Sequence, residues 1–191
     1  FEGSRHLTVS LIKKKSDVEE KSILFIKRAQ TRKHPLNEFR SDGGGEYLSN
    51  YFQEFLTDNG TSMSRSTPRS PEQNGKSERI TQTLMSMTRS MIKHAGLPNG
   101  YWCYALECAV YIYNRSSHSS LPRQTSPCEA HYNVVPNLDN LVPFGCIGVS
   151  ANDPAERPPG GLGDRGRLIR MLACDVRHKT YIVCDRNPKH V

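Results

Sequence analysis

The sequence lacks the features of a secreted or membrane protein. Hydrophobic residues make up 36% of its 191 residues, and no run approaches the roughly 20 apolar residues that a membrane-crossing helix needs. No charged segment followed by an apolar one opens the chain, so it shows no signal peptide. Because it begins at Phe1 without a methionine, we expect a piece of a longer polypeptide. Because it shows neither a signal peptide nor a long apolar run, we expect an intracellular protein without a membrane partner.

Metal, disulfide and nucleophile patterns are also absent. The six cysteines are scattered, with no C-x-x-C pair and no Cys/His spacing typical of zinc. The sequence shows no Ser/His/Asp or Cys/His arrangement for nucleophilic catalysis and no glycine-rich nucleotide loop. We therefore expect reduced and mostly buried thiols, as in intracellular proteins.

The charge of the chain favours a polyanionic partner. It has 26 Lys and Arg against 19 Asp and Glu, a formal net charge of +7. Nucleic acid is the obvious partner for such a surface, although a mildly basic charge can also serve solubility alone.

Apolar spacing predicts alternating strands and helices in the first 117 residues. Strands are expected at residues 6–12, 36–40 and 61–64. A helix with a Ser16/Glu19 capping box should run to about Gln30, and a second should start at Ser49. Residues 66–74 hold prolines and small polar residues, which predicts an exposed, mobile loop.

Two further helices should follow that loop. Apolar residues recur at helical spacing from Ile80 to Met91, until Gly96 and Pro98 end the pattern. Residues 101–114 are apolar nearly all round, so we assign Trp102 to the core and not to a base-stacking surface. This order of elements indicates an α/β fold, with helices flanking a mixed sheet.

The amino-acid composition changes after Arg115. A Gly/Pro-rich linker over residues 152–166 precedes short strand-like runs near residues 168–174 and 180–184. We predict a domain of residues 1–117 followed by a β-rich segment of residues 118–191.

Two carboxylates could serve phosphoryl transfer. Asp42 follows a predicted strand and Glu78 lies at the start of the long predicted helix. Carboxylates on rigid elements can hold the two divalent ions that such chemistry uses. Spacing alone favours the simpler interpretation, in which Asp42 caps a turn and Glu78 is a solvated helix residue.

A series of motifs in order resembles Ty1/copia retrotransposon integrases over about three quarters of the chain. The resemblance rests on residues 40–47 (RSDGGGEY), residues 70–79 (SPEQNGKSER), Leu97-Pro98 with Trp102, Asn114-Arg115, residues 125–129 (TSPCE) and residues 143–146 (PFGC).

The resemblance implies an RNase H-like fold and DNA integration by 3'-end processing and strand transfer with Mg2+ or Mn2+. Asp42 and Glu78 would be the second and third metal ligands. The first ligand position aligns with Phe1, with Glu2 beside it, and a phenylalanine side chain cannot bind a metal. The element ends and target DNA would be the partners, the multimeric family suggests a homo-oligomer, and a DNA substrate implies a nuclear location.

Polar residues near Glu78 are candidates for gripping DNA. They are Arg65, Arg69, Gln73, Asn74, Lys76 and Arg79. The bland alternative is a solvated face. Phe1 leaves open whether the chain is an integrase core, active or disabled, or a non-catalytic nucleic-acid-binding remnant of a retrotransposon polyprotein. An RNase H-like nuclease unrelated to integration is a weaker third possibility.

Overall fold

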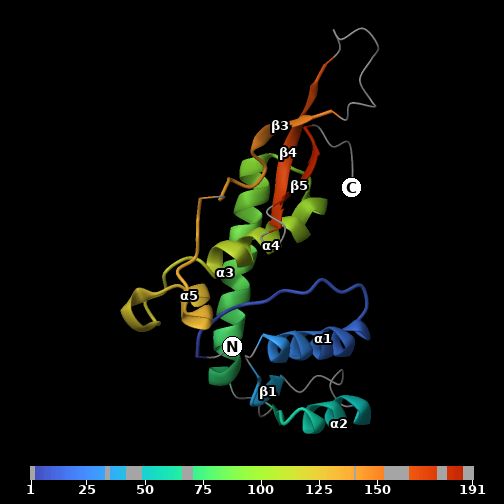
Figure 1. Cartoon of the computed structure of the whole chain (residues 1–191), viewed down its shortest axis with the longest axis vertical. Coiled ribbons are helices and arrows are strands. Elements are labelled where there is room, and N and C mark those ends of the chain that lie inside the picture. Colours follow the sequence, from blue (N-terminus) through green and yellow to red (C-terminus); the bar gives the residue numbers. More distant parts are fainter. Residues whose placement is uncertain are drawn as a thin grey trace. The chain divides into compact units, whose positions relative to one another are not determined.

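The computed structural model describes residues 3–32, 35–41, 49–65, 71–139, 141–152, 164–175 and 180–186 (Figure 1). In chain order the elements are α1 (Asp17–Thr31), β1 (Glu38–Ser41), α2 (Asn50–Asp58), β2 (Ser62–Arg65), α3 (Pro71–Ala95), the 3-10 helix η2 (Asn99–Tyr101), α4 (Trp102–Tyr113), the 3-10 helix η3 (Pro122–Gln124), α5 (Pro127–Tyr132), β3 (Ile147–Ala151), β4 (Gly166–Asp175) and β5 (Thr180–Asp185). The predicted α/β class is confirmed. The expected single mixed sheet is not found among the described residues, whose strands form a parallel pair and a separate antiparallel sheet of three strands.

The chain forms two compact units. Unit 2 comprises residues 10–81, and unit 1 comprises residues 1–9 together with residues 82–191. The boundary near residue 118 stays a prediction about domain organisation. Among the described helices, none combines the length and apolar character that crossing a membrane requires.

Unit 2 is built on a short parallel pair of strands. β1 pairs with β2 in parallel, with Glu38 opposite Ser62 and Ser41 opposite Arg65. Helices α1 and α2 contribute Ile26, Phe52 and Leu56, which are almost fully buried and form the core of this unit.

The first turns of α1 and α2 are capped differently. The Ser49 hydroxyl accepts a hydrogen bond from the Phe52 amide, the usual way an N-cap satisfies the first turn. The predicted capping box at Ser16 is wrong, because its side chain makes no cap bond. Asp17 instead accepts from the Lys13 and Lys14 amides, at 3.3 and 3.1 Å, and so orders the entry to α1.

Unit 1 packs the end of α3, η2 and α4 against an antiparallel sheet of order β3-β4-β5. Its core is a cluster of buried residues from α3, α4, β4 and the connecting segments: Ile92, Ala95, Leu97, Tyr101, Ala105, Phe144 and Leu172. The strand-like runs predicted after residue 166 are confirmed as β4 and β5. The residues of the predicted linker from 153 to 163 lie outside the described ranges.

The end of α3 lies very close to the main chain of Gly145, two residues before β3. Gly145 has a φ of 76°, and a Cβ atom there would lie 2.3 Å from the Ala95 Cβ. The Arg170 guanidinium donates to the Ala95 carbonyl at 2.5 Å. Together they explain why the PFGC segment needs glycine at its third position.

The predicted strand at residues 6–12 is wrong. These residues have strand-forming side chains but form no ladder in the structure. The side-chain amide of Asn114 takes the place of one ladder rung: its Oδ1 accepts from the Leu7 amide and its Nδ2 donates to the Leu7 carbonyl, both at 2.8 Å. Segment 3–9 is therefore attached to the end of α4.

Three further expectations need correction. Residues 71–74 are helical and not loop, because a proline, which has no amide hydrogen to leave unpaired, suits the first helical position. Trp102 was assigned to the core, but it is 47% exposed, since the buried side of α4 carries Ala105 and Ala109 instead. The strand β3 was not predicted.

Candidate metal and nucleic-acid site

The predicted ligand Glu78 lies in α3, within unit 2. Because α3 begins at Pro71, Glu78 sits about two turns into the helix and not at its first turn. Its carboxylate is exposed and makes no hydrogen bond or ion pair with the described residues. A carboxylate that no neighbouring cation neutralises is free to accept a hard metal ion.

The second predicted ligand follows β1 directly. β1 ends at Ser41, which is buried, and the next residue is Asp42. Asp42 itself lies outside the described residues, and so do Phe1 and Arg69. The described residues contain no group of three His, Cys, Asp or Glu side chains able to hold a metal.

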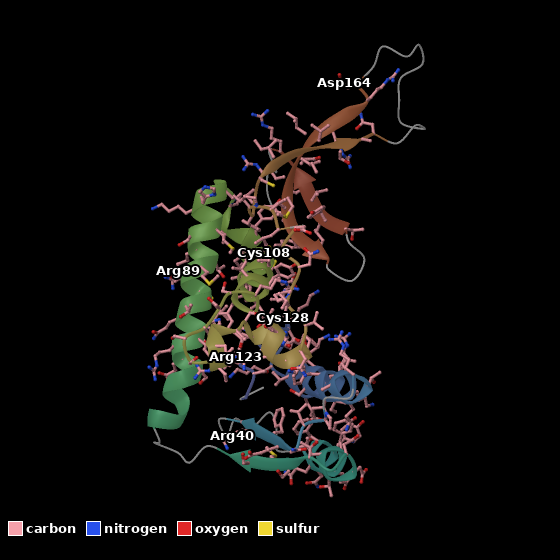
Figure 2. The ribbon with its side chains drawn as sticks, turned by 60° about the vertical axis from the view of Figure 1, so that its left-hand side comes forward. Arg40, Arg89, Cys108, Arg123, Cys128 and Asp164 are labelled. Carbon is pink, nitrogen blue, oxygen red and sulfur yellow. The ribbon has the colours of Figure 1, made fainter. Side chains whose placement is uncertain are left out.

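A polar cluster occupies the exposed side of β1 and β2. Arg40 donates to the Ser64 hydroxyl at 3.3 Å and forms an ion pair with Glu38 at 3.3 Å (Figure 2). Hydrogen bonding from Ser64, then from Arg40, and the Arg40 charge hold the pKa of Glu38 below its usual value. Sequence reasoning missed this cluster, although alternation along residues 38–40 could have indicated it.

Of the residues predicted to contact DNA, Arg79 has a described side chain. It is exposed, and its Nε donates to the Gly75 carbonyl one turn earlier, at 3.0 Å. Arg65 ends β2, and Gln73, Asn74 and Lys76 lie in α3, but their side chains are not among those described.

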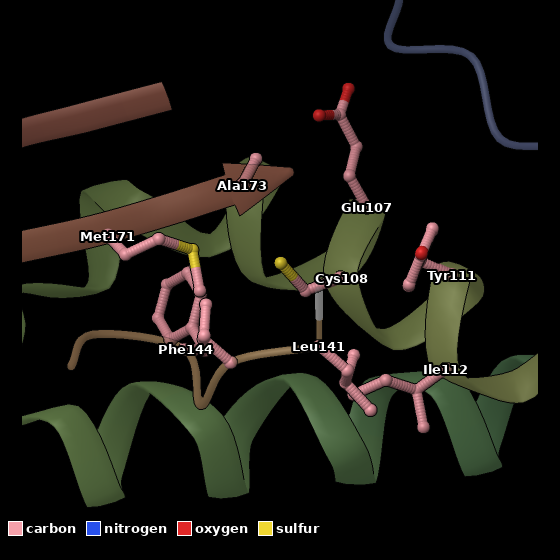
Figure 3. Close-up of a pocket in the computed structure, with 9 residues that line it drawn as sticks. Glu107, Cys108, Tyr111, Ile112, Leu141, Phe144, Met171 and Ala173 are labelled. Atoms are coloured by element: carbon pink, nitrogen blue, oxygen red, sulfur yellow. The ribbon is translucent and has the colours of Figure 1, made fainter. Parts of the chain in front are cut away.

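A separate pocket in unit 1 has no catalytic character. It lies between α4 and β4, holds about 100 Å³, and is lined mainly by apolar side chains such as Ile112, Leu141 and Phe144 (Figure 3). Glu107 lies at its edge, where partial burial raises the pKa of its carboxyl. An apolar hole of this size is a packing feature, because it offers no converging polar groups to a substrate.

The described cysteines are free thiols that are less buried than expected. Cys103, Cys108, Cys128, Cys146 and Cys184 are half-buried and form no disulfide with one another.

Solved structures with this fold are integrase catalytic cores. The catalytic core domain of HTLV-2 integrase, solved in complex with magnesium in a trimeric form, aligns with a TM-score of 0.52 over 67% of this chain and 78% of that one, at 21% identity. A simian T-cell lymphotropic virus intasome chain, solved in complex with the PP2A regulatory subunit B56 gamma, aligns with a TM-score of 0.53 over 95% of this chain and 66% of that one, at 18% identity. The RNase H-like fold of these cores is therefore the fold of this chain.

Sequence comparison identifies the family. No protein-family model matches the chain. The retrovirus-related Pol polyprotein from transposon RE1 of Arabidopsis thaliana is 35% identical over 185 residues, which covers 94% of this chain and 12% of that polyprotein. The chain corresponds to the region of Ty1/copia retrotransposon Pol polyproteins that is homologous to the retroviral integrase catalytic core. It spans only about an eighth of the length of the RE1 polyprotein.

Proposed function

We propose that this chain is the DNA-integrating core of a retrotransposon, acting by metal-dependent polynucleotidyl transfer, with Asp42 and Glu78 as metal ligands. The observation that carries the proposal is Glu78, an exposed carboxylate on a long helix, without an ion-pair partner among the described residues. It lies in the same unit as β1, the strand that Asp42 follows.

Carboxylates of this kind suit the reaction of the family. In both steps an oxygen nucleophile, water in 3'-end processing and a DNA 3'-hydroxyl in strand transfer, attacks a phosphodiester phosphorus while the bond to the leaving oxygen breaks. Bound Mg2+ or Mn2+ would supply the positive charge that such a step needs. Asp42 and Glu78 would hold the ions through hard oxygen ligands.

DNA would bind beside the metal ligands Asp42 and Glu78. Arg79 is one residue from Glu78 and its side chain is exposed, so it would contact a phosphate of DNA bound beside Glu78. Arg65, Arg69, Gln73, Asn74 and Lys76 would extend this surface for element ends and target DNA. The net charge of +7 supports such binding. We propose a nuclear location because the substrate would be DNA, and a homo-oligomer by analogy with the multimeric integrases.

Phe1 occupies the position of the first ligand and should cripple the chemistry while it leaves DNA binding largely intact. Metal ligands position ions, whereas phosphate contacts supply most of the affinity for nucleic acid. Catalysis and binding are therefore separable in this chain.

Mn2+ titration calorimetry tests the metal site. We expect Phe1→Asp to raise Mn2+ affinity at least about tenfold over the unchanged chain, since a third carboxylate completes the ligand set. Adding Asp42→Ala and Glu78→Ala to Phe1→Asp should abolish that gain, whereas adding Asp58→Ala, which removes an exposed carboxylate at the end of α2, should not. Equal heats from all variants would rule out the metal site.

The second candidate function is a non-catalytic nucleic-acid-binding remnant, which Phe1 favours. Phe1→Asp with Mn2+ should then show no strand transfer between labelled oligonucleotides, while duplex DNA binding stays salt-dependent. Strand transfer by Phe1→Asp that disappears with Glu78→Ala would decide for the integrase core.

A further inference from the structure

The sheet of unit 1 carries an apolar face that is exposed in the described part of the chain. Along β3, Ile147 and Val149 are 52% and 72% exposed, while Gly148 and Ser150 between them are half-buried. A solvent-facing strand normally shows the opposite pattern, with polar residues outward. β3 therefore turns its aliphatic side chains toward solvent.

The strand register extends this face onto β4. Leu168 lies directly opposite Val149 and is 44% exposed. A Cβ on Gly166 would lie 2.8 Å from a Val149 methyl, which confirms that Val149 lies over the same side of β4 as Leu168. We call Ile147, Val149 and Leu168 the β3–β4 apolar face; the strands lie side by side in Figure 1.

Arginines border this face on the β5 side. The Arg186 amide donates to the Leu168 carbonyl at 3.3 Å, so Arg186 lies beside the face. Arg170 lies opposite Ile147, and its guanidinium donates hydrogen bonds to the carbonyls of Ala95 and Arg186. The exposed Arg186 has no ion-pair partner in the described part of the chain, so its charge is available to a ligand.

The chemistry of the face selects among possible occupants. Bases of nucleic acid stack on aromatic side chains, and this face is purely aliphatic. A second copy on this face would bring Arg186 near another chain of net charge +7, which disfavours self-association through this face. Alternating aliphatic and acidic side chains would satisfy both the apolar face and Arg186.

We propose that the β3–β4 apolar face is a docking site for an acidic, aliphatic-rich segment of a partner protein. The aliphatic side chains of the segment would cover Val149 and Leu168, and a carboxylate would pair with Arg186. The carboxylate should lie on the β5 side of Leu168, where Arg186 is placed by its main-chain bond to Leu168. The site does not depend on the proposed metal chemistry.

Fluorescence anisotropy with the full chain and a labelled peptide tests the proposal. The probe is a peptide of about 12 residues that alternates leucine or valine with glutamate, long enough to span the strands. Two matched peptides replace glutamate by lysine, or the aliphatic residues by alanine. We expect the acidic aliphatic peptide to bind at least about tenfold more tightly than either.

Variants of the chain locate the binding. Val149→Ser with Leu168→Ser should weaken the acidic peptide about tenfold, because aliphatic contact area is lost. Arg186→Glu should do the same through charge reversal. Arg167→Glu is the matched control. Arg167 is exposed on β4 beside Leu168 but projects from the opposite side of the sheet, and its reversal changes the net charge by the same amount as Arg186→Glu. Circular dichroism confirms that each variant folds.

Several results would overturn the proposal. Equal losses with Arg167→Glu and Arg186→Glu would mean non-specific attraction by net charge. If Val149→Ser with Leu168→Ser dissociated a dimer in sedimentation velocity, the occupant would be a second copy. If the same pair weakened binding of a single-stranded oligonucleotide and left the peptide unaffected, the face would bind nucleic acid.

Discussion

Unit 2 and unit 1 hold their segments together by different means. In unit 2, α1 and α2 place Ile26, Phe52 and Leu56 in one apolar cluster, with Phe39 of β1 against the Phe52 ring at 5.3 Å. In unit 1 an apolar cluster is supplemented by side chains that bind distant main chain. Asn114 holds Leu7, and Arg170 holds Ala95.

The two kinds of contact, apolar packing in unit 2 and side-chain bonds to main chain in unit 1, should respond differently to substitution. Aliphatic packing tolerates changes of similar volume, because it depends on size more than direction. A hydrogen bond to a particular main-chain group depends on geometry. Unit 1 should therefore respond to small changes at a few positions, and unit 2 to loss of volume in its cluster.

The largest expected effect is on unit 2. Phe52→Ala should lower the free energy of unfolding by about 3–5 kcal/mol, because Phe52 is fully buried. Hydrogen exchange should show the loss of protection mainly in residues 10–81. The neighbouring exposed Tyr51→Ala is the control and should change little. Equal loss of protection in both units would break the comparison.

Gly145→Ala tests the close approach in unit 1. We expect a loss of about 2–3 kcal/mol, because the new Cβ would collide with Ala95 and the backbone φ is positive. Gly75→Ala, with open space around it inside α3, should instead stabilise the chain by about 0.5–1 kcal/mol. Urea denaturation measures both, and a neutral Gly145→Ala would contradict the role of the contact.

Asn114→Ala sharpens the comparison at the attachment of segment 3–9. The change should cost about 1–3 kcal/mol, because it strips the partners from both main-chain groups of Leu7 and Asn114 is only 5% exposed. The Leu7 amide should exchange faster in the variant. Exposed Asn99→Ala provides the control, and unchanged exchange at Leu7 would show that the bonds do not hold the segment.

Ser49→Ala should cost about 1 kcal/mol, because it removes the N-cap bond of α2. Ser16→Ala is the matched variant and should be close to neutral, since Ser16 makes no cap bond at α1. Thermal unfolding of both variants gives the comparison. A loss at Ser16 as large as that at Ser49 would argue against the capping difference.

The smallest expected effect is the pH dependence contributed by Glu38. Its pKa is lowered in the folded chain, so its contribution to stability is present above the unfolded pKa and is lost as pH falls through the folded one. The loss therefore lies below about pH 4.5. Glu38→Gln should flatten stability in that window, and an unchanged profile would mean that the Ser64 and Arg40 contacts add nothing.

Sequence periodicity predicted local elements well and long-range pairing poorly. The helices at α1, α2 and α4 and the strands β1 and β2 are confirmed to within a few residues, because each follows from its own apolar spacing. Residues 6–12 failed because strand formation needs a partner strand, which spacing does not report. β3 was missed since its apolar residues face solvent and Gly148 interrupts the pattern.

The candidate site was predictable mainly through motif order. Spacing alone could not separate Asp42 as a ligand from Asp42 as a turn residue. The exposure of Glu78 agrees with a ligand role, and the role of Asp42 stays a prediction. The Glu38, Arg40 and Ser64 cluster was not predicted, because it depends on the register between β1 and β2.

The amide of Asn114 recognises residue 7 only through its main-chain N–H and carbonyl. These two bonds do not involve the side chain of residue 7, so many residue types at this position would keep segment 3–9 bonded to Asn114. Proline is the exception, because it has no N–H to donate. Among related elements, residue 7 should therefore vary freely in chemistry yet exclude proline wherever an asparagine stands at position 114.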